Sequence, residues 1–237
     1  MMTRLLSRFF ATPQFNARTW SNAELNKLGP LLAGRVLNVS GGADSDKEGR
    51  RYRDYFKAAR EYAVSNYGTL AGVENEFAFD LEQRTLPEAL SGRYDIVFSH
   101  TVLEHVFDIH AAVANLCALS GDVIVTVVPF LQSYHHDTWY GDYWRFSPTA
   151  LQRLFGDKGF ETVYLNWNED PLGNIYVLHV CARHPSRWQA IATLQPLHEF
   201  GPGVSRNHLL FGAGGREQAA IALHDRHEDA RKSCTTG

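Results

Sequence analysis

Cysteine is scarce in this sequence, and its few cysteines lie far apart. The 237 residues include only three of them, Cys117, Cys181 and Cys234. An odd and widely separated set argues against a disulfide framework and matches no zinc-binding spacing. Such a pattern fits a reduced protein, so we expect a cytoplasmic location.

A surplus of charge and long apolar runs are also missing. The chain has 23 Lys and Arg against 26 Asp and Glu, whereas a general nucleic-acid binder usually has a strong basic bias. We therefore expect no nucleic-acid partner. No apolar run approaches the roughly 18 residues that a membrane span needs, so no transmembrane segment is expected. The first ten residues, MMTRLLSRFF, are predicted to form a short amphipathic helix, with a weak membrane-surface contact as the alternative.

Short apolar segments recur at the spacing of an α/β protein. Hydrophobic residues make up 44% of the chain, which suits one packed domain rather than disorder. The continuous Val and Ile run at 122–128 is typical of a central strand that is covered on both faces. We expect seven strands, at residues 35–40, 61–66, 76–79, 94–99, 122–128, 162–167 and 175–182.

Helices are predicted between the earlier strands, and two of them have clear start signals. Asp108 is a good N-cap for one helix, and Ser147 followed by Pro148 starts another that runs to Gly159. Right-handed crossovers between parallel strands give a helix–sheet–helix sandwich. The polar segment 168–174 predicts that the last two strands form an antiparallel hairpin.

The pattern divides the chain into three parts. Residues 1–34 are predicted to be an N-terminal helical cap, 35–185 the core, and 186–237 a C-terminal extension. Within the extension, residues 201–215 are glycine-rich and predict a loop or linker. Residues 216–231 predict a charged, solvated helix.

A glycine pair follows the first strand, in the segment VLNVSGGADSD at residues 36–46. Ligands of open parallel sheets bind beyond the carboxyl ends of the strands, and glycine lets the backbone approach them closely. Gly41 and Gly42 offer this, although a lone pair of glycines is also compatible with an ordinary turn. Asn66, near the end of the second strand, can accept from a ribose through its amide oxygen. Asp80, after the third strand, can accept from an exocyclic amine or serve only as a cap.

Two later segments carry a resemblance to a known family. YDIVFSHTVLEHVFD (94–108) and HHDTWYGDYWRFSPTALQRLFGDKGFETV (135–163) resemble motifs of the class I S-adenosylmethionine-dependent methyltransferases. The resemblance covers about residues 35–182. It implies a Rossmann-like fold with a seven-stranded, mostly parallel sheet and helices on both faces. It also implies S-adenosylmethionine as cofactor and S-adenosylhomocysteine as product.

The same resemblance implies a set of cofactor-binding residues. Asn38 takes a normally acidic position at the methionine end, and Ser40, Gly42 and Asp44 fall on the three usual glycine positions. We expect Ser40 to need no special φ in a slightly altered turn. Asn66 falls on the ribose position, Asp80 and Leu81 fall on the adenine turn, and backbone groups of Ser99 and His100 face the methionine amino group. The full set of cofactor candidates is Asn38, Ser40, Gly41, Gly42, Asn66, Asp80, Leu81, Ser99 and His100.

The segment after the fifth strand is expected to face the methyl acceptor. Methyl transfer to a hydroxyl needs alignment and a base, and histidine suits the base near neutral pH. His136 is the predicted base and His135 its rival. Asp142 can orient the histidine, and Arg145 can hold an anionic group or simply brace the loop through Asp142.

Other interpretations of this segment stay open. The aromatics Tyr140, Tyr143 and Trp144 suit stacking on a sugar or ring, or simple lid packing. His105 is expected to pack or cap near the following helix. No metal is expected, because the adjacent residues 135–137 rarely point to one ion, although their types can ligate one.

The leading hypothesis is an S-adenosylmethionine-dependent O-methyltransferase that acts on a small molecule or glycan hydroxyl. One alternative is a non-catalytic scaffold or binding subunit, because the glycine loop is degenerate at 38, 40 and 44. A weaker alternative is a nicotinamide-dependent oxidoreductase, which lacks support because no full G-x-G-x-x-G is present. Whether the chain forms a homo-oligomer is left open.

Overall fold

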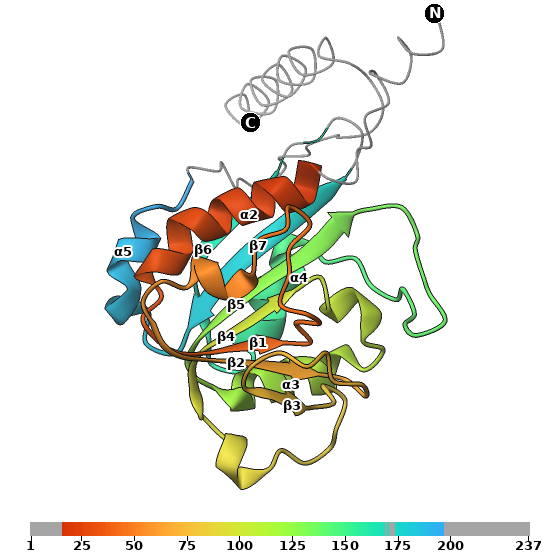
Figure 1. The fold of residues 1–237 in the computed structure, drawn as a ribbon. Coiled ribbons are helices and arrows are strands. Elements are labelled where there is room, and N and C mark those ends of the chain that lie inside the picture. Colours follow the sequence, from red (N-terminus) through yellow and green to blue (C-terminus); the bar gives the residue numbers. More distant parts are fainter. Residues whose placement is uncertain (1–15, 169, 171–173, 197–237) are drawn as a thin grey trace, which may run out of the picture.

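The computed structural model describes residues 16–168, 170 and 174–196. Their centre is a seven-stranded sheet in the order β3-β2-β1-β4-β5-β7-β6 (Figure 1). All seven predicted strands are confirmed to within a few residues. They are β1 (Gly34–Val39), β2 (Ala59–Asn66), β3 (Glu76–Ala78), β4 (Tyr94–His100), β5 (Ser120–Leu131), β6 (Glu161–Trp167) and β7 (Ile175–Ala182).

Strand direction follows the predicted pattern. β1 to β5 are joined by parallel pairings, whereas β7 runs antiparallel to both β5 and β6. The antiparallel hairpin of the last two strands is therefore confirmed, as is the mostly parallel α/β fold. Because β1, β4 and β5 are parallel neighbours, their carboxyl ends lie at one edge of the sheet.

Helices cover both faces of the sheet (Figure 1). α3 and α4 contribute to one buried apolar cluster, and α2, α5 and η3 contribute to the cluster on the other face. Asp108 caps α3 by accepting from the Ala111 amide, and Ser147 caps α4 by accepting from the Ala150 amide, as predicted. The helices are α2 (Asn16–Leu28), α3 (Ile109–Leu119), α4 (Pro148–Gly156), α5 (Gln189–Ala192), and the 3-10 turns η2 (Gly29–Leu31), η3 (Tyr52–Tyr55), η4 (Glu88–Leu90), η5 (Leu103–His105) and η6 (Pro185–Trp188).

The connections from β1 to β2, from β2 to β3 and from β3 to β4 depart from the expectation of helices between the earlier strands, because none of these fully described segments contains an α-helix. In the connection from β1 to β2, residues 40–58 are all described, and they contain the short turn η3 but no α-helix. Two buried aspartates organise the connection: Asp44 accepts from the Tyr62 hydroxyl at 2.6 Å, and Asp46 accepts from the Tyr55 hydroxyl at 2.6 Å. These long-range hydrogen bonds fix a turn-rich path in place of a helix.

Some predictions fall outside the described residues. These are the N-terminal amphipathic helix, the glycine-rich segment 201–215 and the charged helix at 216–231. Within the described ranges, no helix is both long and apolar enough to cross a bilayer.

Candidate functional site

The predicted cofactor loop leaves the carboxyl end of β1 with a left-handed backbone at alternate residues. Ser40, Gly42 and Asp44 have φ of +53°, +56° and +57°. The expectation that Ser40 needs no special φ is therefore wrong. Only glycine adopts this region without cost, so the serine and the aspartate hold a conformation that their side chains disfavour. Gly41 is also required, because a Cβ there would lie 2.4 Å from the Asn38 amide nitrogen.

The side chains behind this loop are hydrogen-bonded to one another. Asn38 is buried and donates its amide to Asp44 Oδ1 at 3.0 Å. The same oxygen accepts from the Tyr62 hydroxyl, and Asp44 Oδ2 accepts from the Arg53 amide at 3.3 Å. Burial, followed by the nearby Asp44 carboxylate, raises the pKa of Tyr62. Asn38 and Asp44 thus stabilise the loop through hydrogen bonds in the protein interior.

Asn66, the predicted ribose residue, bridges the loop to the start of β3. Its Oδ1 accepts from the Gly42 amide at 2.7 Å, and its Nδ2 donates to the Gly42 carbonyl at 3.0 Å. Nδ2 also donates to Glu76 at 2.5 Å. Glu76 in turn accepts from the amides of residues 71–73, and these backbone bonds help to lower its pKa. No local sequence pattern indicated Glu76.

The other cofactor candidates lie at the ends of β3 and β4. Asp80 accepts from the Glu82 amide at 2.8 Å, which is the bond expected of a turn residue. Leu81 is buried in the apolar cluster under α3. Ser99 and His100 are buried at the end of β4, and His100 Nε2 lies 2.9 Å from the Ser21 hydroxyl of α2. Burial lowers the pKa of His100 to about 3.

The loop after β5 is held together by an arginine–aspartate pair. Arg145 contacts both carboxylate oxygens of Asp142, at 2.5 and 2.8 Å, and Asp142 has no exposed side-chain surface. The remaining Arg145 donors go to the carbonyls of Gln132, Ser133 and Trp144. The arginine lowers the pKa of Asp142 to about 2. This arrangement matches the bracing role that the sequence left open for Arg145.

The two histidines of this loop have different surroundings. The His135 amide donates to Asp142 at 2.8 Å, and His135 Nδ1 lies 3.4 Å from the same carboxylate. His136 is exposed, stacks on Tyr134 at 5.3 Å, and forms no hydrogen bond with any residue that the structure describes. Asp142 can therefore orient His135, whereas His136 lies at the solvent side.

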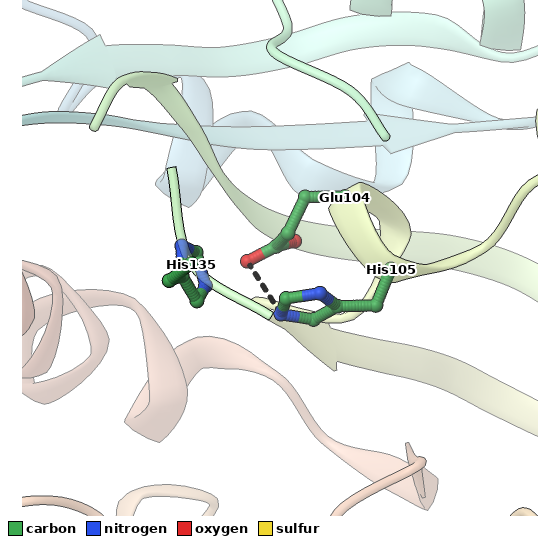
Figure 2. A group of neighbouring side chains, drawn as sticks. All are labelled: Glu104, His105 and His135. Atoms are coloured by element: carbon green, nitrogen blue, oxygen red, sulfur yellow. Dashed lines mark ion pairs between the residues drawn. The ribbon is translucent and has the colours of Figure 1, made fainter. Parts of the chain in front are cut away.

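Figure 2 shows two further residues beside His135 that were not among the predicted site residues. Glu104 and His105 belong to η5, directly after β4. Glu104 is 1% exposed, and neither carboxylate oxygen has a hydrogen-bond partner among the described residues. Burial raises the pKa of this carboxyl to about 8. His105 Nε2 lies 3.8 Å from Glu104 Oε1.

His105 contacts the loop after β5 rather than only packing near its helix. Its Nδ1 lies 2.6 Å from the Gly141 carbonyl oxygen, and its ring lies 4.4 Å from the Tyr140 ring and 5.0 Å from the His135 ring. Burial lowers the pKa of His105, so the neutral ring is favoured. Amides of Tyr143 and Trp144 donate to the Glu104 carbonyl, which brings this loop onto η5. The one signal in the sequence was an adjacent acid and histidine at a strand exit.

No family model and no curated protein matches the sequence. Solved structures match at low identity. A chain of the complex between the Haloferax volcanii Trm112 methyltransferase activator and a proposed methyltransferase is 13% identical, with a TM-score of 0.52 over 72% of this chain and 92% of that one. An S-adenosylmethionine-dependent methyltransferase from Mesorhizobium loti is 13% identical, with a TM-score of 0.50 over 71% and 99%. A proposed methyltransferase from Bacillus halodurans is 11% identical, with a TM-score of 0.50 over 68% and 97%.

These likenesses agree with the strand order and with the antiparallel β7. A fold by itself does not fix an activity or a substrate. The chain has the Rossmann-like fold of the class I S-adenosylmethionine-dependent methyltransferases.

Proposed function

We propose that the chain is an S-adenosylmethionine-dependent methyltransferase that methylates a hydroxyl of a small molecule or glycan. The observation that carries the proposal is the left-handed backbone at Ser40, Gly42 and Asp44. Two of these three residues are not glycine, and each pays on the order of 1–3 kcal/mol for its conformation. Strain of this kind persists where the surrounding structure enforces it, and it is concentrated at ligand-binding sites.

Acceptor chemistry is inferred from the loop after β5. Exposed aromatic side chains lie beside polar groups there, and such a surface suits the face of a sugar or another ring. The exposed aromatics of this loop are Tyr134, Trp139, Tyr140, Tyr143 and Trp144, and the exposed Phe107, which follows η5, contacts Tyr143. We keep His136 as the proposed base, because it is exposed on this surface. His135 is its rival, because Asp142 faces its Nδ1.

A scaffold or binding role is the second candidate, and one observation favours it. The side-chain amide of Asn66 is already hydrogen-bonded to Gly42 and Glu76, and that of Asn38 is hydrogen-bonded to Asp44. A bound cofactor would have to exchange some of these internal hydrogen bonds for its own. If that exchange is unfavourable, the loop is a structural remnant.

Calorimetry with S-adenosylhomocysteine separates the two candidates. A methyltransferase is expected to release or absorb heat at micromolar to millimolar ligand and to show a higher Tm with the ligand bound. NAD serves as the comparison ligand, because a nicotinamide-dependent oxidoreductase would prefer it. No heat and no Tm shift with S-adenosylhomocysteine at millimolar concentration would refute the enzyme and leave the scaffold.

A further inference from the structure

We propose that Glu104, His105 and His135 form a binding site for one divalent transition-metal ion, with Zn²⁺ as the expected occupant. The inference goes beyond methyl transfer, since it concerns ion binding by the apoprotein. It rests on the positions of three side chains, on the hydrogen bonds that orient two of them, and on the unsatisfied state of the third.

The candidate ligand atoms of the three side chains lie close together. One oxygen of Glu104 and one nitrogen of each histidine ring all lie within 4.8 Å of one another. Zn²⁺ binds imidazole nitrogen and carboxylate oxygen at about 2.0–2.2 Å, so tetrahedral ligand atoms lie roughly 3.3 Å apart. The Glu104 and His105 atoms are already 3.8 Å apart. Side-chain rotations that move the three ligand atoms by about 1.5 Å or less would bring them to binding distance.

The orientation of His105 also supports the proposal. Its Nδ1 lies 2.6 Å from the Gly141 carbonyl oxygen. A carbonyl can only accept, so the ring proton is on Nδ1 and Nε2 holds a lone pair. That lone pair is on the nitrogen that faces Glu104. Metal-binding histidines almost always donate their other N–H to a carbonyl or carboxylate in this way.

His135 is oriented in the same manner. Its Nδ1 lies 3.2 Å from the Ser133 carbonyl oxygen and 3.4 Å from Asp142 Oδ2. Both partners are acceptors, which favours the proton on Nδ1 and leaves Nε2 as a ligand. Asp142 is itself fixed by Arg145. Asp142 and Arg145 are therefore positioning residues for His135.

The buried carboxyl of Glu104 supports the proposal as well. Buried polar atoms normally have partners, and leaving them without any costs free energy. Apart from the residue's own backbone amide, which also acts on this carboxyl, neither Glu104 oxygen has a partner among the described residues. Arg18 and Arg145 act on this carboxyl only through space, with no hydrogen bond or ion pair in the described chain. The 3.8 Å to His105 is also too long for a hydrogen bond. A cation between the three side chains would satisfy the carboxylate.

The donor set indicates the kind of ion. Two imidazoles and one carboxylate are a common ligand set of catalytic zinc and of related transition-metal sites, whereas Mg²⁺ and Ca²⁺ prefer oxygen. Three protein ligands leave a coordination position open. If the proposed methyltransferase function holds, an acceptor hydroxyl is the expected occupant of that position, because the loop after β5 with its exposed aromatic side chains lies beside the proposed metal site. The metal site itself does not depend on that function.

Metal titration of the chelator-treated full chain tests the proposal. We expect one Zn²⁺ per chain by calorimetry, and one Co²⁺ per chain by its visible absorption. His135→Ala and Glu104→Gln are expected to weaken Zn²⁺ binding by about 100-fold or more. Replacing even a residue that only hydrogen-bonds to a metal ligand lowers metal affinity by about 10–100-fold. His136→Ala is the matched control, because its ring lies outside the cluster, and it should bind Zn²⁺ as tightly as the wild type.

Glu104→Gln also controls for misfolding. The substitution keeps the shape of the side chain and removes an ionisable group whose charged form burial disfavours, without breaking a hydrogen bond to another described residue. The variant should therefore fold. Without metal its Tm should be equal to or above that of the wild type. Added Zn²⁺ should raise the Tm of the wild type and leave that of Glu104→Gln unchanged.

Two outcomes would overturn the site. One is the absence of stoichiometric Zn²⁺ or Co²⁺ binding to the wild type. The other is equal binding in wild type, Glu104→Gln and His135→Ala, which would place the ion elsewhere. Neither outcome bears on S-adenosylhomocysteine binding, so failure of the metal site and failure of the proposed methyltransferase function are distinguishable.

Discussion

Replacing Asp44 tests whether the loop after β1 is held by its buried aspartate. In Asp44→Ala, the Asn38 amide and the Tyr62 hydroxyl lose their acceptor, and both residues are buried. Each unsatisfied donor costs about 1–3 kcal/mol. Alanine at φ +57° is strained about as much as the aspartate that it replaces, so backbone strain adds little to this loss. Removal of the buried carboxylate offsets part of this cost. We therefore expect the free energy of unfolding of Asp44→Ala to be lower than that of the wild type by roughly 3–5 kcal/mol.

A second substitution separates the two contributions. Asp44→Gly removes the carboxylate but tolerates the positive φ, so it should be more stable than Asp44→Ala by about 1 kcal/mol. Asp54→Ala is the control, because Asp54 lies in the same connection and forms a surface ion pair with Arg51 at 3.4 Å. That change should stay within about 0.5 kcal/mol of wild type.

Urea unfolding followed by circular dichroism gives these free energies. The whole fold is expected to be stable by only about 5–15 kcal/mol, so a loss of the predicted size is easily measured. A loss below about 1 kcal/mol in Asp44→Ala would refute the role of the hydrogen bonds. Equal stability of the alanine and glycine variants would refute the contribution of backbone strain.

Three further predictions concern binding, turnover and pH. Asp80→Ala should weaken S-adenosylmethionine binding by about 1–3 kcal/mol in calorimetry, and unchanged affinity would remove Asp80 from the site. His136→Ala should lower turnover by roughly 10²–10⁴-fold with cofactor affinity intact, and normal turnover on the true acceptor would exclude it as base. Burial lowers the pKa of His179 to about 3. As the pH falls, this histidine is therefore protonated in the unfolded chain before it is protonated in the folded one. Stability should therefore fall between about pH 6.5 and 3, by up to ~1.4 kcal/mol per unit. His179→Gln should reduce this slope in urea midpoints, and an unchanged slope would contradict the assignment.

Local sequence signals were sufficient for most of the fold. Continuous Val and Ile runs mark strands that are buried on both faces, and Asp108 and Ser147 carry their cap function in their own side chains. The hairpin of β6 and β7 followed from the polar segment between them. The connection at 40–58 was not predicted, because its path depends on Tyr55 and Tyr62, which reach back to Asp46 and Asp44.

The candidate site was predicted only in part, for a similar reason. Strand exits directed the prediction to the carboxyl edge of the sheet, and the pairing of Asp142 with Arg145 was one of the open alternatives. Glu104 and His105 were not identified, because their significance depends on the return of the loop after β5. That return is fixed by backbone bonds from Tyr143 and Trp144 to the Glu104 carbonyl. Such contacts join residues almost forty positions apart and leave no local pattern.

The two halves of the site differ in what a ligand would gain there. In the proposed cofactor loop, Asn38 and Asn66 already have internal partners, so a cofactor would gain only the difference between new and old hydrogen bonds. Net gains from such exchange are small, about 0.5–1.5 kcal/mol per bond. At the proposed metal site, the buried Glu104 oxygens have no hydrogen-bond partner in another described residue. A cation there would displace the proton that burial favours on Glu104 but would break no hydrogen bond of this carboxyl to another described residue. The proposed ion is therefore expected to bind independently of the proposed cofactor.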